Sequence, residues 1–230
     1  MSDRATSERA TSDRAVPDRI AGAVHEAQAH DSAARHVAGE ALYIDDLPEP
    51  VGLLHVQLGL SAKAHARILR VELDAVRAAA DVVCVLTAAD VPGENDVSPT
   101  HRHDEPLLAT DLVEFVGQPI FAVAARTREA ARRAVHLARI EYEELPAILD
   151  VADAIPGGVL VTDPLRLARG DLPAALAAAP HRLRGQMRIG GQEHFYLEGQ
   201  IALAIPGEED EIQVWSSTQH PSEIQHMVAK

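Results

Sequence analysis

Strand-like and helix-like patterns alternate through residues 32–148, and this alternation limits the fold more than any other feature of the sequence. In LLHVQLGL, residues 53–60, apolar side chains occupy every second position from Leu54 to Leu60. A period of two is typical of a half-buried strand. We therefore expect a strand here, with the leucines and Val56 on its buried face and His55 and Gln57 on the other.

Further strands are predicted in three stretches: RILRVEL (67–73), the apolar run DVVCVL (81–86), and IEYEEL (140–145). FVGQPIFAVAA (115–125) is also a strand candidate, but its internal glycine and proline indicate an edge strand or a bulge. Strands interleaved with helices predict one mixed α+β domain.

Helices are predicted between these strands. DAVRAA (74–79) is a short one, and Thr127 is a good N-cap for a second, whose apolar face combines four alanines with one valine. These five residues are Ala130, Ala131, Ala134, Val135 and Ala138.

Four segments are expected along the chain. Residues 1–29 repeat a short R-A-T-S-[DE]-R unit and predict a disordered leader without the apolar core of a secretory signal. Residues 30–148 form the mixed domain, and 149–170 form a linker. Residues 171–230 contain a hairpin built from IALAI and IQVWSST and a helix that opens at Pro221. A segment this short supplies little hydrophobic core. It is therefore predicted to be the beginning of a second domain.

Charge and cysteine content exclude several classes of protein. The net charge of −14 disfavours nucleic acid and anionic membrane surfaces as partners. No stretch has the roughly 18 apolar residues of a membrane span. The sequence has one cysteine, Cys84, which excludes an internal disulfide framework and fits a cytoplasmic protein. Its thiol is expected to be unreactive because the residues around it are apolar.

The strongest candidate site is GGQEHFYLEGQ, residues 190–200. Gly190 and Gly191 permit close approach of the backbone to a bulky ligand, and Gln192 offers a neutral amide donor and acceptor. The alternative is structural: a Gly-Gly turn that leads into a strand, with Phe195 and Leu197 inward. Spacing alone leaves both open.

A second polar group, HRHDE at residues 101–105, has the ligand types of a metal site. It offers no third ligand at a recognisable spacing, so a solvated surface loop is the better interpretation. Phosphate-loop, dinucleotide, hydrolase and thiol-redox motifs do not occur in the sequence.

Five stretches together resemble the molybdenum-binding subunit of bacterial xanthine dehydrogenases. They are HDSAARHVAGEALYIDDLPEP, DEPLLA, FVGQPIF, GGQEHFYLEGQ and SSTQHPSEIQHMVA, and the resemblance runs from about residue 30 to 230. It implies an α/β hammerhead domain followed by the start of the molybdopterin-binding domain.

The resemblance also implies chemistry. Such enzymes hydroxylate hypoxanthine and xanthine to urate at a molybdenum–molybdopterin centre, with water as the oxygen source. A partner subunit with [2Fe-2S] clusters and FAD passes the electrons to NAD. The Gln192 amide would contact the molybdenum oxo ligand without ligating the metal, Gly190 and Gly191 would lie against the cofactor, and Phe195 and Tyr196 would anchor the segment by packing.

The family's GGGFGG loop, its substrate-orienting Glu and Arg, and its general-base Glu would all follow Lys230. The 230-residue chain alone is therefore expected to be inactive and to need the remainder of the subunit. Two alternatives stay open: a non-catalytic fragment or assembly module, and a related molybdenum hydroxylase that acts on aldehydes or other N-heterocycles.

Overall fold

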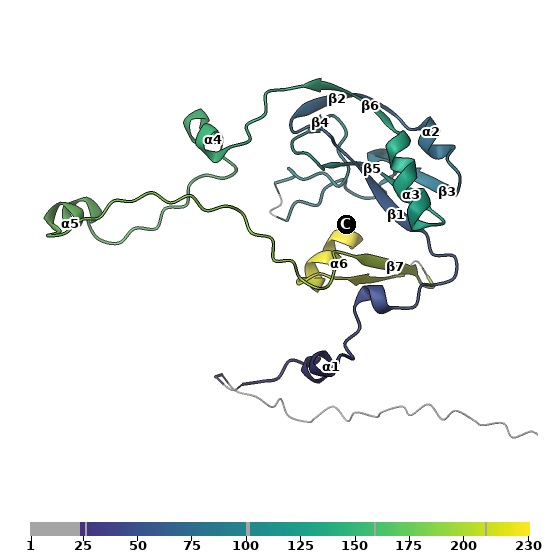
Figure 1. Ribbon diagram of the computed structural model, residues 1–230, viewed down its shortest axis with the longest axis horizontal. Coiled ribbons are helices and arrows are strands. Elements are labelled where there is room, and N and C mark those ends of the chain that lie inside the picture. Colours follow the sequence, from purple (N-terminus) through teal and green to yellow (C-terminus); the bar gives the residue numbers. More distant parts are fainter. Residues whose placement is uncertain (1–23, 26, 100–101, 159, 210) are drawn as a thin grey trace, which may run out of the picture.

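The computed structural model describes residues 24–25, 27–99, 102–158, 160–209 and 211–230 (Figure 1). Most of the leader predicted for residues 1–29 lies outside this described part. Among the described residues, no helix combines the length and the apolar character that crossing a bilayer requires.

A three-stranded antiparallel sheet forms the first layer of the mixed domain. Its strands are β1 (His55–Leu60), β5 (Pro119–Ala125) and β3 (Val82–Leu86), with β5 in the centre. Helix α3 (Arg128–Ala134) contacts β1, β3 and β5 through its small side chains. All of these strands and α3 were predicted from the sequence.

A second antiparallel sheet has the order β4 (Leu112–Val113), β2 (Ala66–Glu72) and β6 (Arg139–Glu144). Short elements connect the strands of the two sheets: α2 (Asp74–Arg77), η2 (Ala88–Asp90) and η3 (Val135–Leu137). Two further elements precede β1, namely α1 (Ala33–Ala38) and η1 (Ile44–Asp46).

One hydrophobic cluster joins the two sheets. Val113 of β4, Val76 of α2, and Phe121 and Val123 of β5 are its largest fully buried side chains. Burial of each such side chain stabilises the fold by about 1.5–3 kcal/mol. The buried hydrophobic residues of the described chain therefore lie within 66–134, inside the range predicted for the mixed domain.

The predicted faces of β1 are wrong, although the strand itself is confirmed. Val56 is 63% exposed and Leu58 40%, whereas Gly59 is buried. A Cβ atom at Gly59 would lie 2.0 Å from Cε1 of Phe121. The missing side chain makes room for that ring, so the glycine side of the strand faces the core.

The prediction of an edge strand for residues 115–125 is also wrong. β5 is the central strand, and Ile120 to Ala125 are buried. Pro119 is its first residue, where a missing N–H does not interrupt the ladder. The alternative prediction of a bulge is confirmed, because the register shifts between Gly59 and Leu60, and Leu60 pairs with Pro119.

Local chemistry at the ends of β5 and α3 follows the sequence. Thr127 Oγ1 accepts a hydrogen bond of 3.1 Å from the Ala130 N–H, so the predicted N-cap is confirmed. Cys84, by contrast, is exposed, so its thiol is not packed as expected from the apolar run around it.

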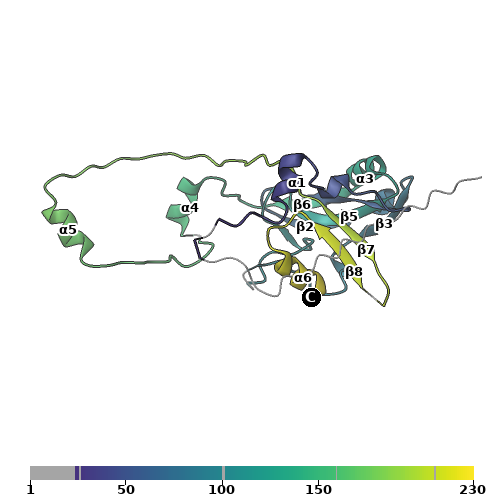
Figure 2. The same cartoon turned by 90° about the horizontal axis from the view of Figure 1, so that it is seen from below.

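The second half of the chain has none of this burial. After the first domain come α4 (Val151–Gly157), which lies inside the predicted linker, and α5 (Leu172–Ala178). Both lie on a long excursion away from the sheets (Figure 2). The predicted hairpin is confirmed as β7 (Ala202–Pro206) and β8 (Ile212–Ser216), and the predicted helix as α6 (Pro221–Ala229). No described residue after 150 is buried, which agrees with the small core expected there.

Candidate functional site

The segment 189–200 is irregular chain that leads from the α5 excursion into β7. Gly190, Gly191 and Gln192 are all exposed. Apart from chain neighbours, no described atom lies within 4 Å of the Cβ position of either glycine. The backbone here is therefore open to a large ligand, and the described residues leave that space free.

An open hollow lies directly after Gln192. One side is formed by Glu193, His194, Tyr196, Glu198 and residues 200–202, and the other by residues 216–219, around about 950 Å³. The start of the hairpin holds the two sides together. Ser217 N–H donates to the Ile201 carbonyl at 3.2 Å, and Ile201 N–H donates to Ser217 Oγ at 3.1 Å.

Local hydrogen bonds shape the first side of the hollow. Glu193 Oε1 accepts a long bond of 3.4 Å from the Phe195 N–H, and Phe195 has a left-handed backbone with φ of 52°. The Gln200 amide donates to the Tyr196 hydroxyl. Carboxylates, an imidazole and hydroxyls thus surround the space and offer both hydrogen-bond acceptors and donors to a polar ligand.

The structure brings only part of the predicted site together. The hollow is lined by later residues of the motif, and none of the three predicted site residues, Gly190, Gly191 and Gln192, lines it. The strand alternative for this segment is wrong, since no described strand pairs with residues 189–200. Phe195 is 93% exposed and Leu197 86%, so neither these side chains nor Tyr196, also exposed, anchor the segment by packing.

Sequence reasoning missed the second side of the hollow, Ser216 to Gln219. The sequence feature that could have identified it is the polar run SSTQ at the end of β8. This strand pairs with β7, which follows the motif. Because β8 runs antiparallel to β7, the end of β8 lies beside the beginning of β7. Strand pairing could therefore have placed these hydroxyls next to the motif.

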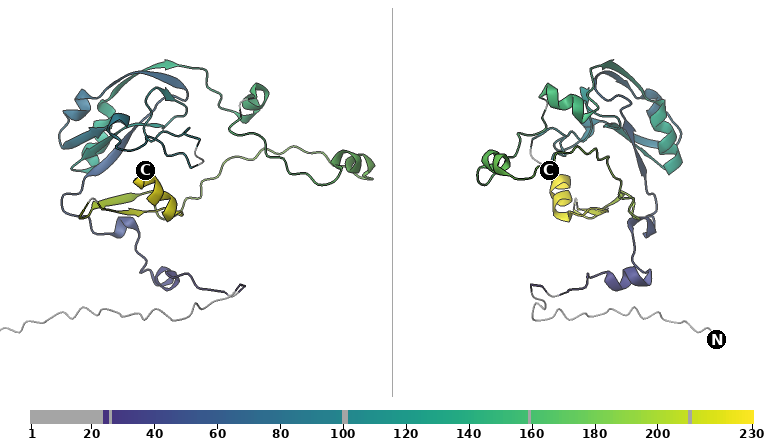
Figure 3. Two further views of the ribbon diagram at one scale, coloured as in Figure 1. Left: turned by 180° about the vertical axis from the view of Figure 1, so that it is seen from behind. Right: turned by 60° about the vertical axis from the view of Figure 1, so that its left-hand side comes forward.

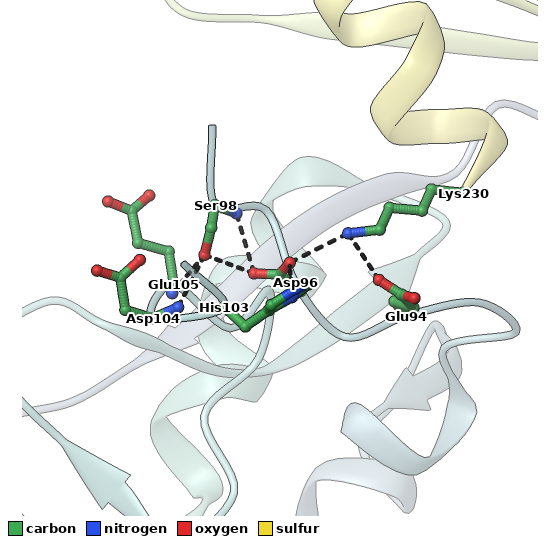
Figure 4. A network of polar contacts seen from close by, with 7 residues as sticks. All are labelled: Glu94, Asp96, Ser98, His103, Asp104, Glu105 and Lys230. Atoms are coloured by element: carbon green, nitrogen blue, oxygen red, sulfur yellow. Dashed lines mark hydrogen bonds and ion pairs between the residues drawn. The ribbon is translucent and has the colours of Figure 1, made fainter. Parts of the chain in front are cut away.

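His101 of the HRHDE stretch lies outside the described residues, and residues 102–105 are exposed, as expected of a solvated loop. Polar contacts nevertheless join part of this stretch to neighbouring residues (Figure 4). His103 Nδ1 lies 2.8 Å from Asp96 Oδ2, and the ammonium of Lys230 lies 3.1 Å from the same oxygen. Within the described part of the chain, Glu94, Asp96 and His103 form the one group of three possible metal ligands, within 4.8 Å of one another. Lys230 already supplies their positive charge, so we assign no metal here.

The two halves of the chain match two domains of one family. Residues 38–146 match the "Aldehyde oxidase and xanthine dehydrogenase, a/b hammerhead domain", and residues 154–230 match the "Molybdopterin cofactor-binding domain". The chain therefore carries the a/b hammerhead domain of aldehyde oxidases and xanthine dehydrogenases, followed by the start of a molybdopterin cofactor-binding domain, which confirms the predicted fold class.

Several proteins similar to the chain in sequence are named xanthine dehydrogenase. The chain is 41% identical over 205 residues to the enzyme of Drosophila pseudoobscura pseudoobscura and 40% identical over 211 residues to that of Oryza sativa subsp. japonica. These alignments cover 88% and 90% of this chain but 15% of each relative. The chain thus spans about a seventh of the length of these relatives.

Solved structures support the same fold. Quinoline 2-oxidoreductase from Pseudomonas putida 86 aligns with a TM-score of 0.72 at 30% identity, over 86% of this chain and 27% of that one. Aldehyde oxidoreductase from Desulfovibrio gigas aligns with a TM-score of 0.68 at 24% identity, over 82% and 23%. The second likeness shows the fold alone.

Proposed function

We propose that the chain is the N-terminal part of the molybdopterin-binding catalytic subunit of a xanthine dehydrogenase of the bacterial type. The complete enzyme would hydroxylate hypoxanthine and xanthine to urate with water as oxygen source. The observation that carries the proposal is the match of residues 154–230 to a molybdopterin cofactor-binding domain, since this range contains the GGQEHFYLEGQ motif. The 41% identity to a xanthine dehydrogenase supports the choice of substrate.

The residues of the motif suit a molybdenum cofactor. Gly190 and Gly191 leave their backbone uncovered, and no described side chain fills the space beside them. The Gln192 amide is neutral and exposed, so it can donate to a polar group without competing as a metal ligand.

When bound, the cofactor supplies the two-electron oxidation. Gly190 and Gly191 would lie against it, and Gln192 would orient it by a hydrogen bond from the side-chain amide. Ser216 to Gln219 would hold the opposite wall of the hollow through the Ser217–Ile201 hydrogen bonds. A donor fixed in place lowers the reorganisation needed during reaction.

The proposal includes partners that the chain does not contain. Electrons would pass to [2Fe-2S] clusters and FAD on a separate small subunit in the cytoplasm, with NAD as the final acceptor. The 230 residues alone would be inactive, because a pocket requires groups that converge from several segments.

A second candidate is a hydroxylase of other N-heterocycles. The alignment with quinoline 2-oxidoreductase at a TM-score of 0.72 and 30% identity favours it over an aldehyde substrate. Steady-state rates of the complete enzyme with hypoxanthine, xanthine, quinoline and benzaldehyde separate these functions. Preference for the purines would support our proposal, and preference for quinoline would replace it with the second candidate. No turnover of any of them would favour a non-catalytic assembly module.

A further inference from the structure

The end of α6 lies against a loop of the hammerhead domain that is far from it in sequence. Figures 1 and 3 show the last turn of α6 between the β7–β8 hairpin and this domain. The loop comprises residues 93–99 and 102–105, which we call the docking loop. Glu94 and Asp96 are its contacts with Lys230.

Asp96 is fixed within the docking loop by Ser98. Its Oδ1 atom accepts hydrogen bonds from the Ser98 N–H at 3.1 Å and from Ser98 Oγ at 2.5 Å (Figure 4). Ser98 Oγ in turn accepts from the N–H groups of Asp104 at 2.9 Å and Glu105 at 2.8 Å. Ser98 is buried and the Asp96 side chain is 11% exposed, so the carboxylate is oriented by the loop itself.

The second oxygen of Asp96, Oδ2, contacts both His103 of the docking loop, at 2.8 Å, and the end of α6. Lys230 Nζ lies 3.1 Å from Asp96 Oδ2 and 2.6 Å from Glu94 Oε2. The hydrogen bonds from Ser98 lower the pKa of Asp96. The contact with Glu94, and then that with Asp96, raises the pKa of Lys230. Both partners are therefore charged over the physiological pH range.

Gly93 is a second observation, independent of the ion pairs, that supports a close contact between the docking loop and the end of α6. A Cβ atom at this position would lie 2.5 Å from the carbonyl oxygen of Lys230. The obstacle is backbone rather than a flexible side chain, so any residue larger than glycine would displace the end of α6. Val97, Pro99 and Met227 line a hollow of about 290 Å³ beside this contact.

We propose that the docking loop fixes α6 to the hammerhead domain, with Asp96 and Lys230 as positioning residues for the wall of the site hollow. Residues 216–219, which form that wall, directly precede α6. Anchoring the far end of α6 therefore limits where this wall can lie. The inference concerns the contact between the two domains and does not depend on the bound cofactor or on the substrate.

The sequence supplies a direct test, because its only two lysines are Lys63 and Lys230. Each makes an ion pair with a glutamate: Lys63 with Glu144 inside the hammerhead domain, and Lys230 with Glu94 across the two domains. A water-soluble carbodiimide joins an amine to a carboxylate in contact with it. Peptide mapping of the treated chain by mass spectrometry is expected to find both products, with Lys230 joined to Glu94 or Asp96.

Gly93→Ala is the matched variant. It should reduce the Lys230 product about two- to five-fold, the range expected from loss of an exposed ion pair. The Lys63–Glu144 product should be unchanged and reports that the hammerhead domain is folded. The proposal is overturned if Lys63 couples to Glu144 while Lys230 couples only to other carboxylates, or if Gly93→Ala leaves the yield at Lys230 unchanged.

A conservative substitution gives a second readout. Lys230→Met should raise the hydrogen-exchange rates of the α6 amides about two- to five-fold, the range for an exposed ion pair. Lys230→Arg should restore the wild-type rates, because the positive charge is kept. Equal rates in all three proteins would contradict a fixed helix end.

Discussion

Gln192 is the residue on which the proposed chemistry depends. Its side chain is exposed, and the adjacent Gly190 and Gly191 have open space at their Cβ positions. A residue in this setting contributes little to folding, so its type is better explained by a ligand than by stability. The roles of these three residues stay predictions, since they come from the resemblance of the motif.

We expect Gln192→Ala in the complete enzyme to lower kcat about 10- to 100-fold, the usual effect of losing a group that orients a metal centre. Molybdenum content and the thermal unfolding temperature should be unchanged, because the Gln192 side chain is exposed among the described residues. Steady-state kinetics and metal analysis measure both. Gln213→Ala, on the exposed side of β8, is the control; wild-type turnover in the Gln192 variant would refute the assignment.

Asp96 gives a pH-dependent prediction. Its pKa in the folded chain is lowered by the Ser98 hydrogen bonds. The stabilisation from its carboxylate is therefore present above the ordinary Asp pKa of about 3.9 and is lost as pH falls through the lower folded value. The free energies of unfolding of wild type and Asp96→Asn, measured with urea, should differ most above pH 5. They should become equal in strong acid. A difference that does not change with pH would contradict this linkage.

At the scale of elements, the sequence predicted where strands and helices form better than which of their faces are buried and which strands pair. Period-two and apolar runs identified β1, β2, β3, β5 and β6 because each pattern is local. The buried face of β1 could not be predicted, since it depends on contact between Gly59 and Phe121, which lies 62 positions later in β5. The central position of β5 is likewise a property of pairing, which a single strand does not encode.

The Gly59–Phe121 contact can be tested by substitution. Gly59→Ala should lower the free energy of unfolding by about 1–3 kcal/mol, because the new methyl group overlaps the buried ring. In Phe121→Leu the ring is absent, so adding Gly59→Ala should cost less than it does in wild type. Denaturant unfolding of the four proteins measures this coupling.

Gly185→Ala is the control, since no described atom lies within 4 Å of its Cβ position. Its effect should be within about 0.5 kcal/mol. Additive effects of the two substitutions at Gly59 and Phe121 would show that the two residues do not meet as described.

At the scale of the molecule, the chain combines a packed domain with a second half that has no buried described residue. The sequence predicted this asymmetry because residues 171–230 are too short a segment to supply much core. It did not predict the docking loop, because Asp96 and Lys230 are 134 positions apart and no local pattern relates them. A site built from exposed segments needs such contacts to keep its walls in place.

The most direct test of the proposed function is to purify, from the native source, the protein that contains the peptide GGQEHFYLEGQ and to measure its molybdenum content. We expect about one molybdenum atom per polypeptide, in a chain several times longer than 230 residues, whereas the recombinant 230-residue chain should bind none. Stoichiometric molybdenum in the native protein would support residues 190–192 as part of a molybdopterin site. A native protein that contains this peptide but no molybdenum would contradict the account.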